Sequence, residues 1–386
     1  MTRVLTRKGR QTVKLRQMAT AAPALALAAG LAAGCGSSGT SSTPSSSPGT
    51  SGVQTELGGS ANYTSMEALY KKAVAAGQTS VVIYGPSAGT DTPLYTAFKK
   101  TFPDITVSGV PVVGPPMTAK LSAEMSSGKH VDDIAYTGST DMLSYIGSGW
   151  FKPYKPTTLP PASKLAAESY GPGNNFFGFT VGLSGMVYNT NSVQASQVPT
   201  TWTGLLSSQW KDKLVMYDPT AVGEMDDIFA HLALVPGDSG LMTGLKTQDT
   251  QLSPSTDITG PLTAVAQGAK SLGIGVPYAF FVAAKAGGAP VQFYLLKADN
   301  YTVTLYGGIV KGAPDPLAAE LYEDWMYTPQ AAKAIASEGE YSTVLADPGP
   351  SGEPKLSDIK QFPYIPLSGI PSADGTAITQ AQHVYG

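Results

Sequence analysis

Short apolar runs alternate with amphipathic segments along the first part of the folded chain. Three runs have the continuous apolar character of strands buried on both faces, at residues 80–84 (SVVIY), 105–107 and 134–136. Helical patterns precede and separate these runs, at residues 66–76, 92–101 and 117–126. Because strands and helices alternate, the pattern predicts a parallel sheet with helices on its faces.

A second round of the same alternation follows. Further strands are expected at residues 182–189, 213–217, 273–276, 291–295 and 303–310. Further helices are expected at residues 201–206, 226–234, 316–327 and 329–339, and from about residue 279. The simplest topology is an α/β fold of two lobes, with one chain crossing near residue 180 and a return near residue 305. Lobe one then comprises residues 79–181 and 304–386, and lobe two comprises residues 182–303.

The N-terminal residues have the pattern of an export signal. Six basic and no acidic side chains lie in the first seventeen residues, and residues 18–31 are apolar or small. This run is shorter than the roughly twenty residues of a membrane-spanning helix, so residues 1–34 are expected to be a signal peptide. Small residues precede Cys35 as in a bacterial lipobox, although Ala32 stands where Leu is usual. We therefore expect an acylated Cys35 that anchors the chain in the cell membrane. The alternative is a soluble secreted protein in which Cys35 is a free thiol.

The tract after Cys35 consists almost entirely of Ser, Thr, Gly and Pro. This composition cannot offset the entropy of ordering, so residues 35–60 are expected to form a flexible tether. Cys35 is the only cysteine, which excludes disulfide bonds within the chain and metal sites built from cysteines. Without the six basic residues of the signal, 19 Lys and Arg remain against 28 Asp and Glu. The resulting net charge near −9 argues against nucleic acid as a partner.

Residues 85–89 (GPSAG) match the G-x-S-x-G pattern of a hydrolase nucleophile elbow. The helix expected after this turn begins five residues beyond Ser87, and no earlier strand is available to supply an oxyanion loop. The three possible histidine partners are also poorly placed. His130 directly precedes a strand, His231 lies within a helix among apolar neighbours, and His383 lies in a polar tail. A surface serine hydrolase that uses Ser87 is therefore kept only as an alternative.

The same loop suits a polar ligand better. Small residues at a helix start let a ligand approach backbone amides and the positive end of the helix dipole. Similar loops follow the strands at 134–136 and 213–217, and ligands of open α/β sheets lie at these carboxyl ends of parallel strands. The candidate ligand-binding residues in the three loops are Ser87, Gly89, Thr90, Thr137, Gly138, Ser139 and Thr220.

The pattern offers little support for a metal site or a resident cofactor, and we predict neither. Asp132 and Asp133 precede a strand and are expected to be solvated. Glu224, Asp226 and Asp227 cluster at a helix start, where the dipole favours acidic side chains in any case.

Several stretches between residues 80 and 344 resemble one family. They include SVVIYGPSAGT, GFTVGLSGMVYNTNSV, KDKLVMYDPTAVG and PYAFFVAAKAGGAPVQF. The most specific is GGIVKGAPDPLAAELYEDWMYTPQAAKAIASEGEYSTV, which follows a crossing strand. These stretches resemble the periplasmic-type solute-binding proteins of ABC importers, in the group that includes ferric-iron-binding proteins.

The resemblance implies a type II periplasmic-binding-protein fold, in which two lobes joined by crossing strands close on a small molecule. It implies a receptor without catalytic activity that acts as a monomer at the extracellular face of the membrane. Its partners would be a small ligand and an ABC permease. A lipoprotein adhesin that uses the same fold for protein contacts is a third class, and it would take no small ligand.

The resemblance also bears on the ligand. Ferric-binding members use adjacent tyrosines where this chain has residues 277–280 (PYAF), so only Tyr278 is available. A trivalent cation requires several anionic oxygen ligands, which leaves an iron site incompletely supplied. Relatives also bind phosphorylated sugars, small carboxylates, polyamines or thiamine. The loops rich in Ser, Thr and Gly favour a small polar or anionic solute. We expect it to bind with the loops after residues 80–84 and 134–136 on one side and with Thr220 and Tyr278 on the other.

Overall fold

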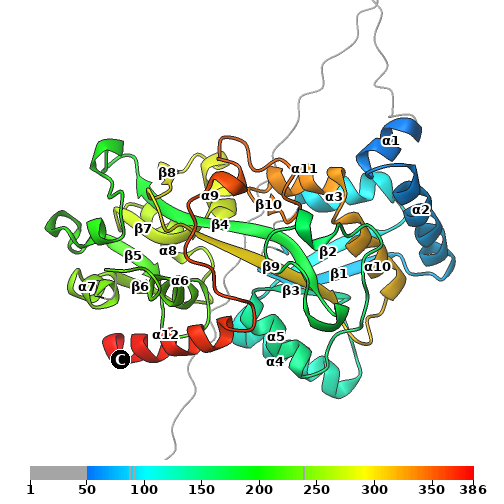
Figure 1. Ribbon diagram of the computed structural model, residues 1–386, viewed down its shortest axis with the longest axis horizontal. Helices are drawn as coiled ribbons and strands as arrows, with labels where there is room; N and C mark the ends of the chain where they lie inside the picture. The colour runs from blue at the N-terminus through cyan, green and yellow to red at the C-terminus, as the bar shows by residue number, and fades with distance from the viewer. Residues whose placement is uncertain (1–49, 87, 90–91, 238–239) are drawn as a thin grey trace, which may run out of the picture. The chain divides into compact units, whose positions relative to one another are not determined.

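A mixed β-sheet forms the centre of the described part of the chain (Figure 1). The computed structural model describes residues 50–86, 88–89, 92–237 and 240–386, so the predictions for Cys35, Ser87 and Thr90 fall outside it. Within these residues the sheet has ten strands. Its main path runs β2-β1-β3-β9-β4-β7-β5-β6, and β8 and β10 pair with β4. The sheet therefore has a parallel group at each end and two long strands between them.

The first parallel group confirms the strands predicted in the first part of the chain. Its members are β1 (Ser80–Gly85), β2 (Thr106–Pro111) and β3 (Ile134–Thr137). The helices that follow them in turn are α3 (Thr92–Thr101), α4 (Gly114–Ser127) and α5 (Ser139–Gly147). Every residue of β3 is buried, as a continuous apolar run requires when helices cover both faces. Gly128 ends α4 at φ 65°, a left-handed conformation that glycine adopts without strain.

The second parallel group repeats this arrangement. Its strands are β5 (Leu214–Tyr217), β6 (Gln251–Ser253) and β7 (Leu272–Pro277). Its helices are α6 (Glu224–Leu232), α7 (Leu241–Thr247), α8 (Gly260–Ala266) and α9 (Tyr278–Ala286). The sequence pattern predicts β5, α6, β7 and α9, whereas α7, α8 and β6 are too short to stand out in it.

Two antiparallel strands join the groups and confirm the predicted crossing and return. Strand β4 (Phe177–Asn189) pairs with β9 (Tyr301–Ile309) in a register that runs from Phe177 opposite Gly307 to Ser184 opposite Tyr301. β9 also pairs with β3 of the first group, and β4 pairs with β7 of the second. The remaining strands, β8 (Val291–Tyr294) and β10 (Tyr341–Ser342), pair with opposite ends of β4.

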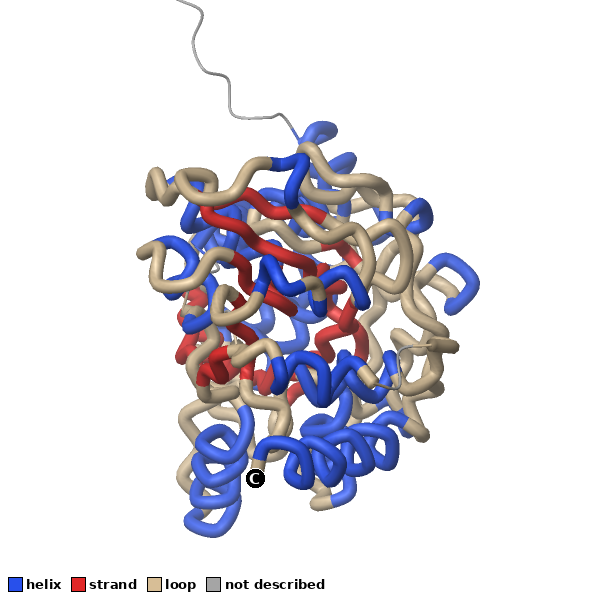
Figure 2. The backbone as a smooth tube through the Cα atoms, turned by 90° about the vertical axis from the view of Figure 1, so that its left-hand side faces the viewer, coloured by secondary structure: helices blue, strands red, loops and turns tan. Residues whose placement is uncertain are grey.

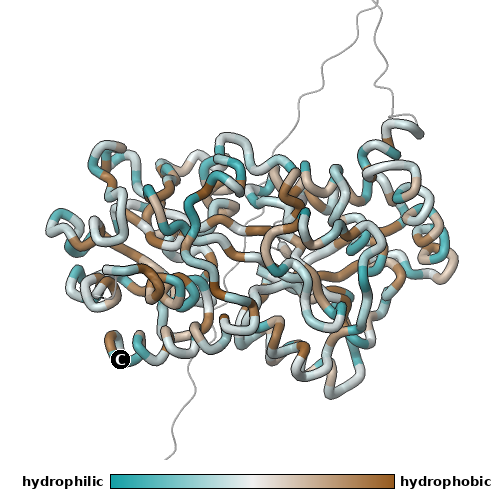
Figure 3. Tube along the Cα trace, in the orientation of Figure 1, coloured by the Kyte–Doolittle hydropathy of each residue, from teal (hydrophilic) through white to brown (hydrophobic). Residues whose placement is uncertain are grey.

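Four hydrophobic clusters cover the sheet, one on each face of each half. In the first half, one cluster packs under α3, α10 (Pro316–Trp325) and α11 (Pro329–Ser337), and another under α4 and α5. In the second half, one cluster involves α6 and α7, and the other α8 and α9. Figure 2 shows helices on both sides of the strands, and Figure 3 shows hydrophobic stretches along them. Alternate strand residues point to opposite faces, so strands such as β1 and β5 each contribute to two clusters.

The N-terminal boundary of the fold differs from the prediction. Residues 35–60 were assigned to the tether, but α1 (Thr50–Glu56) is helical and α2 (Ser60–Ala75) begins at residue 60. Leu57 between them is 1% exposed, within the cluster that contains α10 and α11. Burial of this side chain provides the packing energy that the surrounding Ser, Gly and Thr lack.

The C-terminal end also differs from the expected arrangement. The polar tail is a helix, α12 (Ile370–Tyr385), and it packs mainly on α6 and α7 of the second half, with a smaller contact to α5 of the first half (Figure 1). The hydroxyl of Tyr385 donates a hydrogen bond to the carbonyl of Met242 over 3.0 Å. The chain therefore passes between the halves a third time, between β10 and α12.

Short 3₁₀ turns occupy several connections. They are η1 (Ala162–Lys164), η2 (Pro172–Asn174), η3 (Ala195–Gln197), η4 (Thr203–Leu206), η5 (Ser208–Trp210) and η6 (Leu356–Asp358). The helix predicted at residues 201–206 is thus a single turn of this kind.

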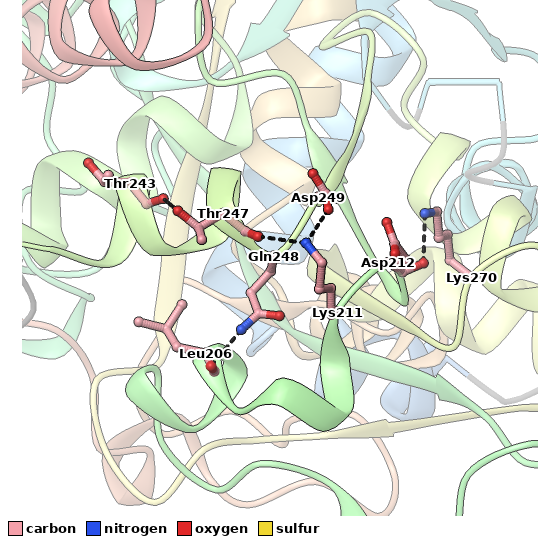
Figure 4. A network of polar contacts seen from close by, with 8 residues as sticks. All are labelled: Leu206, Lys211, Asp212, Thr243, Thr247, Gln248, Asp249 and Lys270. Carbon is pink, nitrogen blue, oxygen red and sulfur yellow. Dashed lines mark hydrogen bonds and ion pairs between the residues drawn. The ribbon is translucent and has the colours of Figure 1, made fainter.

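Polar contacts link the residues that precede the strands of the second parallel group (Figure 4). The ammonium group of Lys211 contacts the Asp249 carboxylate and donates to the carbonyl of Thr247, while Lys270 donates to the carbonyl of Asp212 over 2.8 Å. Asp212 and Asp249 adopt positive φ values of 62° and 54°, which Asp tolerates better than most residues. These charged groups lie at the end of the strands opposite the loops expected to bind ligand.

None of the helices in residues 50–386 that the structure describes is both long and apolar enough to cross a bilayer.

Candidate functional site

A cavity of about 180 Å³ lies where the parallel strands of both groups end. Its walls include Thr137 at the end of β3 and Gly138 after it, Gly223 after β5, Ser255 after β6 and Pro277 at the end of β7. One water needs roughly 10–15 Å³ of such space, so the cavity has room for a small organic solute. This is the location expected for ligands of parallel α/β sheets.

The two crossing strands form another wall of the cavity. Alternate residues contribute, Gly182 and Ser184 from β4 and Tyr301, Val303 and Leu305 from β9. This period of two means that one face of the antiparallel pair is turned toward the cavity. A solute in the cavity would therefore touch both halves of the sheet and the strands that connect them.

The structure brings one of the three predicted loops directly to the cavity. Thr137, Gly138 and Ser139 line it, with Gly138 as the extended N-cap residue of α5 and Ser139 as its first residue. Thr137 and Ser139 are 4% and 5% exposed, so their hydroxyl groups lie in a largely dry environment.

The other predicted residues lie elsewhere or outside the description. Gly89 is exposed and does not line the cavity, although neighbouring Pro86 does, and Ser87 and Thr90 are not described. Thr220 is used locally, because its hydroxyl donates to Asp218 Oδ1 over 2.7 Å, and the cavity is lined instead by Val222 and Gly223 of the same loop.

Tyr278 does not line the cavity either. Its ring packs on Phe293 and Phe281, with centroids 4.9 and 5.5 Å away. Burial and the negative charge of Glu353 raise the pKa of Tyr278 to about 12, so its phenol is neutral. The residues of α9 that do line the cavity are Ala279 and Phe280.

Carboxyl groups are the main polar feature of the cavity, and the sequence pattern does not predict them as site residues. Five line it, namely Asp141, Glu224, Asp227, Glu340 and Asp374. They come from both halves of the sheet and from the C-terminal helix. No Lys, Arg or His side chain belongs to the described lining of this cavity.

Neutral hydroxyl groups hold four of the five carboxyl groups, those of Glu224, Asp227, Glu340 and Asp374. Ser184 donates to Glu224 Oε1, and Tyr301 donates to Asp227 Oδ2. In the first half, the hydroxyl of Tyr136 donates to Glu340 Oε2 over 3.2 Å. Hydroxyl donors orient the carboxyl groups, but they are neutral and leave the negative charge of a buried carboxylate uncompensated.

Burial is the dominant electrostatic influence on these groups. It raises the pKa of Glu224 to about 8, with a smaller contribution from the negative charge of Asp227. It raises the pKa of Asp374 to about 7, and Asp227 again adds to the increase. Burial alone raises the pKa of Asp141. Without a solute, part of the cluster is protonated near neutral pH, because burial disfavours the charged form and neighbouring carboxylates repel one another.

A signal for this site exists in the sequence. All four arginines lie within the first sixteen residues, so residues 17–386 contain none. A guanidinium group is the usual bidentate partner of phosphates and carboxylates. Its absence from the whole folded region argues against the anionic solute favoured by the loop composition alone.

His231 lies beside the cluster but outside the cavity. Its Nδ1 atom is 2.9 Å from the carbonyl of Asp227 and 3.4 Å from the Asp227 carboxylate. Burial lowers the pKa of His231, but the hydrogen bond and charge of Asp227 outweigh it, so the net shift is upward. The imidazole lines a second cavity of about 300 Å³, which shares Ser139, Asp227 and Tyr301 with the first.

The cluster does not form a metal centre. Among the described residues, no three His, Cys, Asp or Glu side chains converge closely enough to hold a metal ion. Asp132 and Asp133, expected to be solvated, are buried instead at 0% and 1% exposure. Asp133 accepts hydrogen bonds from the backbone amides of Val82 and Asp315 and ties β3 to its neighbours.

Comparison with solved structures identifies the fold. Iron-bound HitA from Pseudomonas aeruginosa aligns with a TM-score of 0.64 at 17% identity, over 79% of this chain and 99% of HitA. AfuA from Actinobacillus pleuropneumoniae, with fructose-6-phosphate bound, aligns with a TM-score of 0.64 at 18% identity, over 78% of this chain and 97% of AfuA. The substrate-binding protein of an ABC transporter from Agrobacterium tumefaciens aligns with a TM-score of 0.66 at 16% identity, over 79% and 95% of the two chains. The fold is the two-lobed type II fold of periplasmic binding proteins, as the sequence predicts.

The family follows from a direct match of the sequence. Residues 131–365 match the model of the bacterial extracellular solute-binding proteins. This range includes both crossing strands and most of the cavity wall, and it covers more than half of the chain. The chain therefore belongs to the bacterial extracellular solute-binding proteins. Among curated proteins, none matches it.

Proposed function

We propose that this protein is the receptor of an ABC importer, which captures a small polar solute in the cavity and delivers it to a membrane permease. The observation that carries the proposal is the position of the cavity. Its lining comes from the strand ends of both halves and from the two strands that connect them. A solute bound there contacts both lobes and favours the closed arrangement by its better fit to it.

The lobes of the proposed receptor follow the two halves of the sheet. Residues 79–181 and the chain from 304 through β10 form lobe one, and residues 182–303 form lobe two. Helix α12 moves with lobe two, because it packs on α6 and α7. The hinge lies in β4, in β9 and in the segment between β10 and α12, where the chain passes between the halves a third time.

The proposed ligand contacts combine predicted and newly located residues. Thr137, Gly138 and Ser139 provide hydroxyl and backbone groups from lobe one, and Glu224 and Asp227 provide carboxyl groups from lobe two. Gly89, Thr220 and Tyr278 are left out because they do not line the cavity. Ser87 and Thr90 stay in the proposal as neighbours of the lining residue Pro86.

We also propose that the protein is held at the extracellular face of the membrane through acylated Cys35, as a monomer with a tether that ends before α1. The basic and apolar N-terminal pattern and the isolated cysteine support this anchor. Lipid chains contribute about 0.8 kcal/mol for each buried methylene, so two or more chains hold a protein firmly.

The hydrolase and the ferric-iron receptor have less support. For a hydrolase, His231 would have to serve Ser87, yet His231 lines the second cavity, whereas Pro86, which precedes Ser87 in the sequence, lines the first. For ferric iron, Tyr278 is engaged with Phe281 and Phe293. A receptor without catalytic activity for an organic solute is therefore the function that we propose.

The test is to identify a solute and to follow lobe closure. Small molecules extracted from the purified protein are analysed by mass spectrometry, and each is added back while small-angle scattering is recorded. We expect one solute per chain and a decrease in the radius of gyration. Thr137→Ala combined with Ser139→Ala should weaken binding by roughly 1–3 kcal/mol through lost buried hydrogen bonds. Thr64→Ala, on the exposed face of α2, is the matched control. No bound solute and no compaction with any extracted molecule would reject the receptor function.

A further inference from the structure

We propose that the cavity binds a small organic cation, whose ammonium group lies against the carboxyl groups of Glu224, Asp227 and Asp374. The inference rests on the proposed function and specifies the chemistry of its solute.

The first observation concerns the hydrogen bonds of the Asp374 carboxyl group. This residue lines the cavity and is 3% exposed. Thr140 donates to its Oδ2 atom over 2.5 Å, whereas its Oδ1 atom has no hydrogen-bond partner among the described residues. Asp227 lies within hydrogen-bond reach of Asp374, but one of these two carboxyl groups can donate to the other only while it holds a proton. A buried carboxylate oxygen without a donor is costly, so two such oxygens at a cavity wall point to a donor that arrives with the solute.

Asp227, on the facing helix, is only partly satisfied. It is 9% exposed, and Tyr301 donates to its Oδ2 atom, whereas no hydrogen bond of ordinary length reaches its Oδ1 atom in the described structure. The Nδ1 atom of His231 lies 3.4 Å from this Oδ1 atom, so the imidazole, which lines the second cavity, meets part of the bonding capacity of Asp227. The negative charge of Asp227 acts on Asp374 at close range, and no ammonium or guanidinium group of the described residues lines the cavity to compensate the two carboxylates.

The helix dipoles do not make the cavity suitable for an anion. The amino ends of α5 and α6 face it, and each carries about half a positive charge. However, the first turns of these helices already contain Asp141 in α5 and Glu224, Asp226 and Asp227 in α6. These acidic side chains offset the partial positive charge at the amino ends of the two helices. The cavity therefore presents a net negative charge to a solute.

An organic ammonium ion fits the lining better than a metal ion. No group of three metal-ligating side chains exists among the described residues, so the carboxyl groups are too dispersed for a coordination shell. Tyr217, Ile258 and Phe280 also line the cavity and offer apolar surface to the body of a solute. Aromatic rings also attract cations through their electron-rich faces. An ammonium group can donate one hydrogen bond to each of two or three separated carboxylates.

The position of the cluster links cation binding to closure. Glu224 and Asp227 belong to α6, Asp374 to α12, and Thr140, the partner of Asp374, to α5 of the other half. A cation between these groups draws α5, α6 and α12 together, because it is attracted to carboxylates that otherwise repel one another.

The experiment measures thermal stabilisation of the whole exported chain by probes of matched size. The cationic probes are 1,4-diaminobutane, ethanolamine and choline as chloride salts, and the anionic probes are butyrate, glycolate and phosphate as sodium salts. All are compared with sodium chloride at equal ionic strength. Each is also applied to Glu224→Gln and Asp374→Asn, which keep side-chain shape, and to Asp249→Asn. Asp249 is an exposed carboxylate at the opposite end of the strands and is the matched control (Figure 4).

We expect at least one cationic probe to stabilise the protein more than sodium chloride does. Its dissociation constant should rise by about tenfold or more in Glu224→Gln and in Asp374→Asn and stay unchanged in Asp249→Asn. Stabilisation by an anionic probe that survives both substitutions would overturn the inference and leave the receptor function intact. Absence of a variant-dependent effect for every cationic probe would overturn it as well. If one variant fails to fold, the other decides, because the two carboxyl groups lie on different helices.

Discussion

Thr140 donates a hydrogen bond to Asp374 over 2.5 Å, although 234 residues separate them in the chain. Thr140 lies in the first turn of α5, beside the first parallel group, and Asp374 lies on α12, which packs on helices of the second group. The bond therefore links the two halves of the fold directly at the cavity wall.

Replacement of Thr140 by valine should loosen this link. The Thr140→Val change keeps the shape of the side chain but removes the donor, which leaves both oxygens of Asp374 without a hydroxyl donor among the described residues. We expect the free energy of unfolding to fall by about 1 kcal/mol and the radius of gyration of the solute-free protein to increase. Urea unfolding and small-angle scattering measure the two effects. Thr140→Ser retains a hydroxyl and should behave like the native chain, and equal scattering from all three proteins would contradict the link.

The stability of the solute-free protein should decrease as the pH rises from about 5 to 9. The pKa of Glu224 is raised to about 8 and that of Asp374 to about 7, so the folded state binds protons that the unfolded state has already released. This contribution is complete below the ordinary carboxyl pKa and is lost as the pH passes the raised values. The charged groups that face Asp374 are Asp226, Asp227 and His231, and those that face Glu224 include Asp227. The raised pKa of His231 acts in the same direction.

Thermal unfolding at a series of pH values measures this dependence. In Glu224→Gln the slope between pH 7 and 9 should be smaller, because the amide has no proton to lose in this range. A melting temperature of the native protein that increases steadily across the interval would contradict the assignment.

The crossing strands should tolerate no side chain at Gly307. A Cβ atom there would lie 2.1 Å from Cε2 of Phe179, which is 3% exposed and stacks on Tyr136. Gly307→Ala forces these buried rings to move, and overpacking of this kind costs about 1–3 kcal/mol. Urea unfolding should show the loss. Gly147→Ala is the matched control, because it has no neighbour within 4 Å and should leave stability equal or slightly higher.

Replacement of Cys35 should release the protein from the membrane. Cys35→Ser cannot form the thioether and amide linkages of a lipoprotein, so the chain should move from the membrane fraction to the soluble fraction. Labelling with an alkyne analogue of palmitate, followed by fractionation, measures both events. A native chain that takes up no label would instead support the secreted form with a free thiol.

Local patterns predicted the elements with strong signals of their own. The run at residues 80–84 is β1, and the strand predicted at residues 182–189 is the second part of the longer β4, because strands buried on both faces must be apolar throughout. The crossing near residue 180 and the return near residue 305 also followed from the order of elements. Helix α12 was missed since Asp374, Ala377 and Ala381 are its only buried residues, too few for an apolar stripe.

The sequence by itself determined the fold class, the family and the end of the sheet at which the cavity lies, because these depend on local periodicity and on the order of elements. Tertiary structure decided which polar groups meet there. Glu224 and Asp227 occupy a helix start that could equally face solvent, and Asp374 lies more than a hundred residues further along the chain. Electrostatic interaction depends on distance and burial in space, so this cluster exists only once α12 packs on α6 and brings Asp374 to the cavity.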